Sequence, residues 1–198
     1  KTGIGMMECK KALVEANGDA DEAIKILREK GLAVAAKKAD RVAAEGVVDV
    51  MKSEDGLTTA VLEVNSETDF VAKNATFKAF VRDILATIIK NKPATLEALL
   101  ECTIEGGELT VEQARKDKVF SIGENITIRR FQIIEGTTGS YIHNAGALAV
   151  VAKFDTDVAA SAEFDEFAKN VCMQIAAMNA SYVCRGCVPA EVIENEKA

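Results

Sequence analysis

The sequence predicts an α+β protein in which a small helical module is followed by two related subdomains, each an antiparallel sheet covered by a long helix. Three observations support this prediction. Apolar residues first recur at helical spacing, the period changes to that of strands near residue 46, and a strand-plus-helix pattern returns 87 residues further along. We therefore expect a helical module with its linker over residues 1–43, a first core subdomain over 44–136 and a second over 137–198.

The N-terminal segment is predicted to contain two short helices. The first covers residues 6–17 and ends at Asn17 and Gly18, because glycine readily takes the left-handed conformation that closes a helix. The second begins at Asp19, with Glu22 three residues later as in a capping box. Both boundaries are therefore marked by residues that commonly cap helices.

The helical module is expected to lack its first helix. Gly31 should end the second helix, and the Ala- and Lys-rich residues 32–44 should form a helical linker. Two short helices cannot enclose a core on their own. We therefore expect a further helix before Lys1.

The first core subdomain is predicted to begin with a hairpin. Residues 47–51 and 57–64 have the composition of strands, and Asp55-Gly56 between them is a strong turn signal. A closing strand is expected over residues 126–134, with its even-numbered residues on one face. Together these strands should form an antiparallel sheet.

A long helix should cover this sheet. Asn74 is a favourable N-cap, Pro93 ends the helix, and further helical stretches are expected near 95–102 and 110–121. The apolar residues of the long helix form one stripe at helical spacing: Phe77, Phe80, Val81, Ile84, Leu85 and Ile88.

The second subdomain repeats this pattern. Residues 139–154 read as a hairpin that turns at 144–146, and Ser161 stands where Asn74 caps the first helix. The matching stripe is Phe164, Phe167, Ala168, Val171, Cys172 and Ile175. Amphipathic helices often resemble one another, but the agreement of strand, cap and stripe at one offset favours duplication. Only a short helix is expected after Pro189, so the second subdomain lacks a closing strand.

Composition and charge argue against several classes of protein. The net charge is −7 and the basic residues are scattered, so we expect no direct binding of nucleic acid. No apolar run is long enough to cross a membrane, and we see no signal peptide. No phosphate-binding glycine motif occurs, so we expect no nucleotide, cofactor or metal held by the chain itself.

The five cysteines do not suggest a secreted disulfide framework. Their number is odd and their spacing loose, which fits reduced thiols in a cytoplasm. Cys184 and Cys187 form a C-x-x-C pair, but a structural zinc site would need more ligands, and the strand-to-helix setting of thioredoxin-like proteins is missing. An incidental pair is the favoured interpretation, and a thiol oxidoreductase remains an alternative.

The connector "NSETDFVAKN", residues 65–74, carries an acid and a large aromatic side by side. At the matching place in the second subdomain, residues 155–158 keep an acid but have no aromatic. Phe70 is therefore either a side chain that the fold does not require or one that packs under its own loop. If Phe70 is exposed, we expect it to be buried by a partner protein.

A catalytic site is not favoured by the sequence. Glu63, Glu67 and Asp69 lie close along the chain, but one is on a strand and the others are in a loop, without a fixed spacing. His143 is the only histidine, and it stands just before a hairpin turn, where a contact role is favoured. We therefore expect that the protein is not an enzyme.

Several sequence motifs resemble those of a known protein family. The stretches "KTGIGMMECKKALVEANGD", "AAKKADRVAAEG", "LEVNSETDFVAKN", "IGENITIRR" and "GSYIHNAG" occur in this order. Together they closely resemble bacterial elongation factor Ts. The resemblance implies a cytoplasmic guanine nucleotide exchange factor that binds elongation factor Tu, a GTPase. It also implies an N-terminal module like a ubiquitin-associated domain and a core of two related α+β subdomains.

The resemblance also implies which residues touch the GTPase. The family loop that enters near the magnesium and phosphate site matches Thr68, Asp69, Phe70 and Val71. Further contacts with the GTP-binding domain match Met6, Met7, Ile122 and Gly123, and a contact with a different domain matches His143. Many members continue with a helical hairpin and a closing strand. A non-catalytic adaptor that binds a partner through the helical module is the alternative function.

Overall fold

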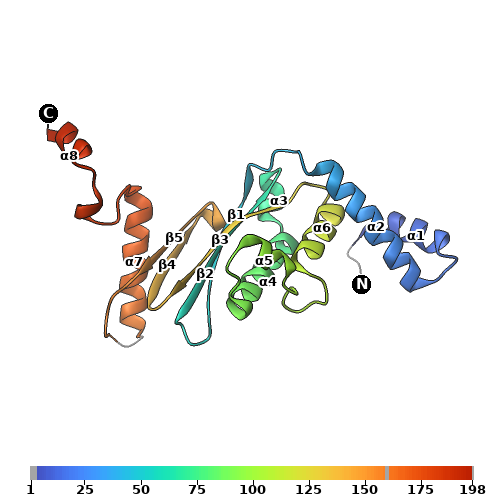
Figure 1. Ribbon diagram of the computed structural model, residues 1–198, viewed down its shortest axis with the longest axis horizontal. Coiled ribbons are helices and arrows are strands. Elements are labelled where there is room, and N and C mark those ends of the chain that lie inside the picture. Colours follow the sequence, from blue (N-terminus) through green and yellow to red (C-terminus); the bar gives the residue numbers. More distant parts are fainter. Residues whose placement is uncertain (1–3, 159–160, 198) are drawn as a thin grey trace.

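The computed structural model describes residues 4–158 and 161–197 of the chain, and shows a mixed α and β protein with two small antiparallel sheets (Figure 1). The first three residues of the predicted module and residues 159, 160 and 198 of the predicted second subdomain lie outside this description. The N-terminal helices are at one end of the molecule, the larger sheet and its helices are in the middle, and the C-terminal helix is at the other end.

The elements follow in the order expected from the sequence, except that the short helix α3 was not expected. The helices are α1 (Met6–Glu15), α2 (Ala20–Lys38), α3 (Asp69–Lys73), α4 (Ala75–Asn91), α5 (Leu96–Glu101), α6 (Val111–Ile122), α7 (Ala162–Met178) and α8 (Ala190–Lys197), with 3-10 turns η1 (Asn144–Gly146) and η2 (Arg185–Cys187). The strands are β1 (Glu45–Lys52), β2 (Thr58–Ser66), β3 (Thr127–Glu135), β4 (Thr138–His143) and β5 (Leu148–Lys153).

The capping residues of the first two helices were predicted correctly. Asn17 and Gly18 take positive φ angles of 49° and 89° after α1, and the Gly18 N–H donates to the carbonyl of Leu13. The Asp19 carboxylate then accepts hydrogen bonds from the backbone N–H groups of Asp21 and Glu22. The two helices are therefore joined by a tight turn that is closed by backbone and side-chain hydrogen bonds.

The prediction that Gly31 ends the second helix was wrong, because α2 continues without a break to Lys38. Gly31 is buried, and a Cβ atom at this position would lie 3.5 Å from the Phe120 side chain of α6. Gly31 is thus an interior residue of α2 that lies beside α6, and it does not stop the helix. The predicted helical linker is correspondingly shorter, because residues 39–44 are not helical.

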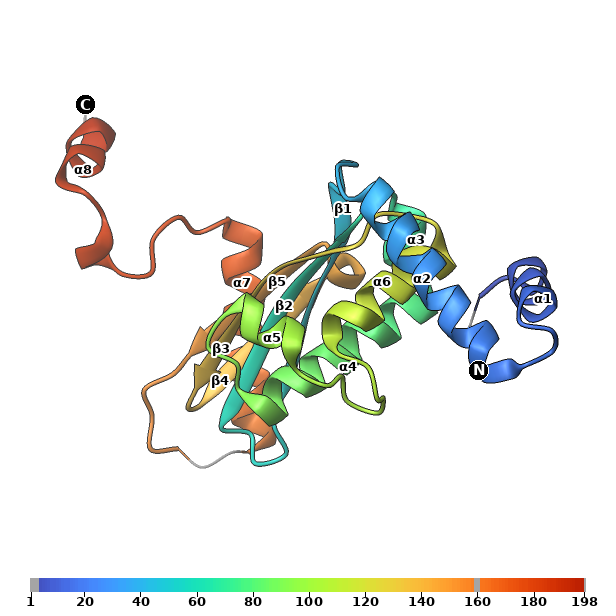
Figure 2. The same ribbon diagram turned by 45° about the vertical axis from the view of Figure 1, so that its right-hand side comes forward.

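A small core holds α1 and α2 together, and α6 completes it. Its buried residues are Ala12, Ala16, Ala23 and Leu27. Phe120 packs against this cluster from α6, 89 residues after Gly31 in the sequence. The helical module therefore rests on the core of the protein, as Figure 2 shows for α2 beside α6.

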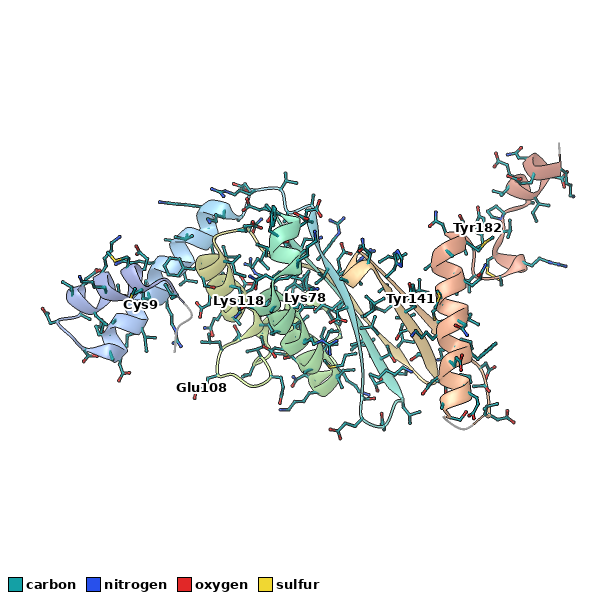
Figure 3. The ribbon with its side chains drawn as sticks, turned by 180° about the vertical axis from the view of Figure 1, so that it is seen from behind. Cys9, Lys78, Glu108, Lys118, Tyr141 and Tyr182 are labelled. Atoms are coloured by element: carbon teal, nitrogen blue, oxygen red, sulfur yellow. A yellow bond between two sulfur atoms is a disulfide. The ribbon has the colours of Figure 1, made fainter. Side chains whose placement is uncertain are left out.

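The central sheet has the order β1-β2-β3, and all its neighbours are antiparallel. Helix α4 covers one face, and its predicted apolar stripe, Phe77, Phe80, Val81, Ile84, Leu85 and Ile88, is buried throughout. The Asn74 side chain accepts hydrogen bonds from Thr76 and Phe77, as a helix cap does. The ammonium of Lys118, which Figure 3 labels on α6, lies 5.9 Å from the centre of the Phe80 ring.

The predicted alternation of β3 fails at Arg129. A β-bulge shifts the register opposite Glu63 and Val64, so that Arg129 is the extra residue. As a consequence Phe131 faces the core, and both arginines are exposed with their guanidinium groups 3.5 and 2.7 Å from the Glu63 carboxylate. The even-numbered residues therefore share one face only up to Ile128.

The second sheet is the hairpin β4–β5, which turns through η1 as predicted and is covered by α7. Ser161 caps α7 by accepting a hydrogen bond from Phe164. The stripe of α7 is far more exposed than that of α4: Phe167 is 56% exposed, whereas its counterpart Phe80 is 1% exposed. Among the described residues, no third strand joins this hairpin.

The C-terminal segment corrects one expectation about the cysteines. Cys184 and Cys187 are joined in a disulfide within the exposed stretch between α7 and α8, so these two are not reduced thiols in this structure. Helix α8 follows Pro189, as predicted. In the described part of the chain, no helix is both long enough and apolar enough to span a bilayer.

Candidate functional site

The connector after β2 is not the open loop that the sequence suggested. Residues 69–73 form the short helix α3, with Thr68 at its N-cap position. Val71 and Ala72 are buried against the core, whereas Phe70 is 82% exposed. The question left open by the sequence is thus answered: the Phe70 side chain is directed to solvent, and its two successors anchor the helix.

Asp69 is engaged within the same turn of helix. Its carboxylate accepts a hydrogen bond of 2.6 Å from the Lys73 ammonium, four residues later. This hydrogen bond is the main reason why the pKa of Asp69 lies below its ordinary value. Asp69 is therefore ionised at neutral pH and already has a cationic partner.

A carboxylate from another segment orients the start of α3. One oxygen of Glu124 accepts the backbone N–H groups of Glu67 and Thr68, at 3.1 and 3.0 Å. The other oxygen accepts the Thr68 hydroxyl at 2.6 Å. Three donors on the connector thus converge on one side chain that follows α6, 56 residues after Thr68.

A carboxylate of the connector, that of Glu67, in turn binds the segment that carries Glu124. Glu67 accepts the backbone N–H of Asn125 at 2.6 Å, and its other oxygen lies 3.5 Å from the Arg41 guanidinium. We call this reciprocal arrangement of Glu67 and Glu124 the carboxylate clamp. The Asn125 amide also donates to the carbonyls of Ala39 and Arg41, which ties the residues after α2 to the same point.

Ile122 and Gly123 lie beside the carboxylate clamp, at the end of α6. Ile122 is half-buried against the core. Gly123 is exposed and takes a φ of 88°, a left-handed conformation that closes the helix. Its carbonyl accepts a hydrogen bond from the Lys38 ammonium at the end of α2. The structure therefore brings these two predicted contact residues close to the Phe70 connector.

Met6 and Met7 lie elsewhere, on the first turn of α1. Their exposed fractions are 83% and 61%, which is unusual for large apolar side chains. Met6 also lines a shallow groove of about 500 Å³ together with Leu13 and Val14. This surface is apolar and suited to a protein partner.

His143 lies at the end of β4, next to the turn η1. The imidazole is exposed, and its Nδ1 is 2.9 Å from the hydroxyl of Tyr141, which is labelled in Figure 3. The turn packs on β1, where a Cβ atom at Gly146 would be 3.0 Å from that of Val47. Since α3 also packs on β1, the first strand supports both the histidine hairpin and the Phe70 helix.

The three acids considered for catalysis do not form one site. Glu63 is paired with the two arginines of the bulge, Glu67 belongs to the carboxylate clamp, and Asp69 is bound by Lys73. Within residues 4–158 and 161–197, no group of three or more acidic, histidine or cysteine side chains is placed to hold a metal ion.

Sequence reasoning missed the residues that brace the connector. Glu124 and Asn125 were quoted only as part of a motif, and Lys38 and Phe120 were not singled out. The one local signal was Gly123, a helix-closing residue directly followed by an acid and an amide. Residues with free polar groups directly after a helix end often bind a neighbouring segment, but the sequence does not say which.

Known proteins resemble this chain over most of its length. A family model described as "Elongation factor TS" matches residues 67–198, which is 132 of the 198 residues. The chain is also 44% identical over 200 residues to "Elongation factor Ts" of Syntrophotalea carbinolica, in an alignment that covers 100% of this chain and 65% of that relative. The chain thus spans about two thirds of the length of the curated relative. It belongs to the elongation factor Ts family.

Proposed function

We propose that this chain is a guanine nucleotide exchange factor for elongation factor Tu and acts in the cytoplasm during translation elongation. Its family membership supports the proposal. The structural observation that carries it is Phe70, an aromatic side chain that is 82% exposed at the start of α3. The buried Val71 and Ala72 hold this helix against the core, and Glu124 binds the residues just before it. The factor acts by binding its partner, without covalent chemistry.

The proposed mechanism is a disturbance of the partner's magnesium site. Mg²⁺ requires near-ideal octahedral geometry and offsets the charge of bound GDP. Phe70 enters the GTPase as a wedge and displaces the elements around the ion. Burial of one Phe side chain stabilises a complex by about 1.5–3 kcal/mol, and each tenfold loss of GDP affinity needs about 1.4 kcal/mol. Phe70 alone therefore accounts for roughly one to two powers of ten of the coupling.

Asp69 is proposed to orient the wedge rather than to bind the metal. Its carboxylate is hydrogen-bonded to Lys73 at 2.6 Å, so a contact with Mg²⁺ would first require that this bond be broken. The bond also fixes the first turn of α3, from which Phe70 projects. Thr68 and Val71 complete the connector as its N-cap and its buried anchor.

The remaining contacts supply affinity. We propose that Met6, Met7, Ile122 and Gly123 bind the GTP-binding domain and that His143 touches a different domain of the GTPase. The two binding equilibria are linked. If the exchange factor lowers the GTPase's affinity for GDP, bound GDP lowers the GTPase's affinity for the exchange factor by the same ratio. GTP then replaces GDP and displaces the exchange factor.

The finer architecture is proposed along with the function. Residues 1–43 form the ubiquitin-associated-like module, and residues 44–136 and 137–198 are copies of one unit. In support, α4 and α7 each have 17 residues, start 87 positions apart and end at a left-handed residue, Lys92 or Asn179. The copies differ because α5, α6 and β3 have no counterparts after α7 among the described residues.

The test is Phe70→Ala in a GDP-release assay, with elongation factor Tu loaded with a fluorescent GDP and the factor at saturating concentration. We expect a loss of the maximal rate by about ten- to a hundredfold, from the burial energy above. Phe167→Ala is the matched control, since it makes the same change at an exposed Phe on α7. An unchanged maximal rate for Phe70→Ala would rule out the wedge.

The second candidate is a non-catalytic adaptor that uses the helical module. The observation that favours it is the apolar groove on α1 beside the exposed Met6. The two functions separate in one titration of elongation factor Tu with the wild-type chain. Binding together with faster GDP release indicates an exchange factor, whereas binding at an unchanged release rate indicates an adaptor.

A further inference from the structure

The direction of the Phe70 side chain depends on the backbone between β2 and α3. In this stretch the N–H groups of Glu67 and Thr68 both have the Glu124 carboxylate as their acceptor, at 3.1 and 3.0 Å. The side chain that orients this turn thus comes from the end of α6 and not from the connector itself.

We propose that Glu124 is a positioning residue for nucleotide exchange. It sets the orientation of Phe70 and, through the carboxylate clamp, joins the wedge to Gly123 and to the residues after α2. This inference deepens the proposed function and rests on it. Glu124 itself touches neither nucleotide nor metal.

The chemistry of the clamp explains why carboxylates are used. A carboxylate offers two oxygens with several lone pairs, so Glu124 accepts three hydrogen bonds from adjacent donors at once. Hydrogen bonds to an ionised carboxylate are stronger than those between neutral groups, and the bond from the Thr68 hydroxyl is also short, at 2.6 Å. The mutual repulsion of Glu67 and Glu124 is offset because each is held by donors on the other's segment and Arg41 lies beside Glu67.

The carboxylate clamp also joins the Phe70 connector to the second predicted contact surface, which is formed by Ile122 and Gly123. Gly123 directly precedes Glu124, and its carbonyl is bound by Lys38. Asn125 directly follows Glu124 and binds the carbonyls of Ala39 and Arg41. The turn over residues 122–125 is therefore the point where the wedge, the end of α6 and the end of the helical module are fixed to one another.

Two substitutions at Glu124 separate positioning from charge. Glu124→Ala removes all three acceptor bonds to Glu67 and Thr68. Glu124→Gln keeps one oxygen for the two N–H groups and offers an NH2 that the Thr68 hydroxyl can accept, so it conserves the geometry without the charge. Thr68→Val removes the hydroxyl bond alone and is the milder variant if Glu124→Ala folds poorly.

The control is Thr110→Ala, which weakens the protein without touching the connector. Thr110 forms a capping box with Gln113 at the opposite end of α6. Loss of such a cap destabilises a protein noticeably, so this variant reports what a general loss of stability does to exchange. Thermal unfolding of all the variants places them on one stability scale.

Two measurements on the full chain test the proposal. Amide hydrogen exchange of Glu67 and Thr68, followed by NMR in the isolated chain, reports the order of the connector. GDP release from elongation factor Tu against factor concentration gives the maximal rate and the half-saturating concentration. For Glu124→Ala we expect about tenfold faster amide exchange and an about tenfold lower maximal rate, with a smaller change in half-saturation. Thr68→Val should show weaker effects of the same kind, and Glu124→Gln should stay near wild type.

The outcomes separate this proposal from the function on which it rests. Unchanged amide exchange in Glu124→Ala, or a rate loss that Thr110→Ala reproduces at equal stability, overturns the role of Glu124. Loss of amide protection without any loss of rate overturns it as well. If the wild-type chain fails to accelerate GDP release, the exchange function is wrong; the amide exchange of Glu124→Ala and Glu124→Gln then decides alone whether the clamp orders the connector.

Discussion

Gly139→Ala tests how closely α7 must lie on the second hairpin. A Cβ atom added to Gly139 in β4 would be 2.6 Å from the Cβ of Ala168 and 2.9 Å from its carbonyl oxygen. Carbon atoms prefer separations of about 3.5–4.0 Å, so the helix must move outward by about 1 Å. The obstructing atoms belong to the backbone and the first side-chain atom of a helix, and neither can rotate away.

Two effects of opposite sign compete in this variant. Glycine within a strand is less stable than alanine by about 0.5–1 kcal/mol, which would make the substitution stabilising. Overpacking in a fitted contact costs about 1–3 kcal/mol. We expect the steric effect to win and to leave a net destabilisation of about 1–2 kcal/mol, or about a 5- to 30-fold shift of the local opening equilibrium.

Hydrogen–deuterium exchange of α7 and of the β4–β5 hairpin, together with urea unfolding, measures this shift. Gly186→Ala is the control in the same half of the chain, because its nearest new contact is the Cys184 sulfur at an ordinary 3.9 Å. Slower exchange or greater stability in Gly139→Ala would refute the steric reasoning and favour strand propensity. An effect confined to α1 and α2 would refute it too, since Gly139 does not touch those helices.

Two further predictions concern the core and its pH dependence. Phe80→Ala should lower the free energy of unfolding by about 3–5 kcal/mol in urea denaturation, because Phe80 is 1% exposed and fully packed; a loss below about 1 kcal/mol would contradict the packing described. For Asp117, burial raises the pKa against the attraction of Arg28 and Lys118, so the folded state binds this proton more tightly than the unfolded chain. The stability contributed by that proton is present below about pH 4 and is lost as pH rises through the raised pKa. The free energy of unfolding of Asp117→Asn relative to wild type should therefore increase with pH. Urea unfolding over a pH series measures this difference, and a decrease with pH would refute the predicted sign.

Local chemistry made some elements predictable from the sequence. Helix α4 is marked at one end by Asn74, at the other by the residues before Pro93, and along its length by one apolar stripe. Each of these signals acts within four residues of the position it governs. The hairpin turn at Asp55-Gly56 is of the same kind, so no knowledge of distant segments was needed.

Other features depend on residues far apart in the sequence. Gly31 looked like a helix end, but it is an interior residue of α2 and is buried beside Phe120 of α6. The bulge at Arg129 depends on the pairing of β3 with β2, in which Arg130 lies opposite Glu63, 67 positions earlier. Local propensity gives no information on either, because in both cases tertiary packing decides the backbone.

In the candidate site, too, some features were predictable from the sequence and others depend on the folded structure. The family resemblance pointed to Phe70 and its neighbours, and the repeat raised the question of why Phe70 has no counterpart. Neither could tell that Phe70 is exposed while Val71 is buried, since both are apolar residues in one short connector. The role of Glu124 was beyond the sequence because its three donors become neighbours only after folding.

The unbroken course of α2 has a consequence for how a partner is held. With 19 residues it spans about 28 Å at 1.5 Å per residue. Under the proposed function it acts as a stiff spacer between the proposed contact residues Met6 and Met7 on α1 and the Phe70 helix. A partner that docks at one end meets the other end at a preset distance, so the second attachment is an intramolecular event with a high effective concentration. Flexible residues inserted near Gly31 would keep both attachment points but reduce their avidity.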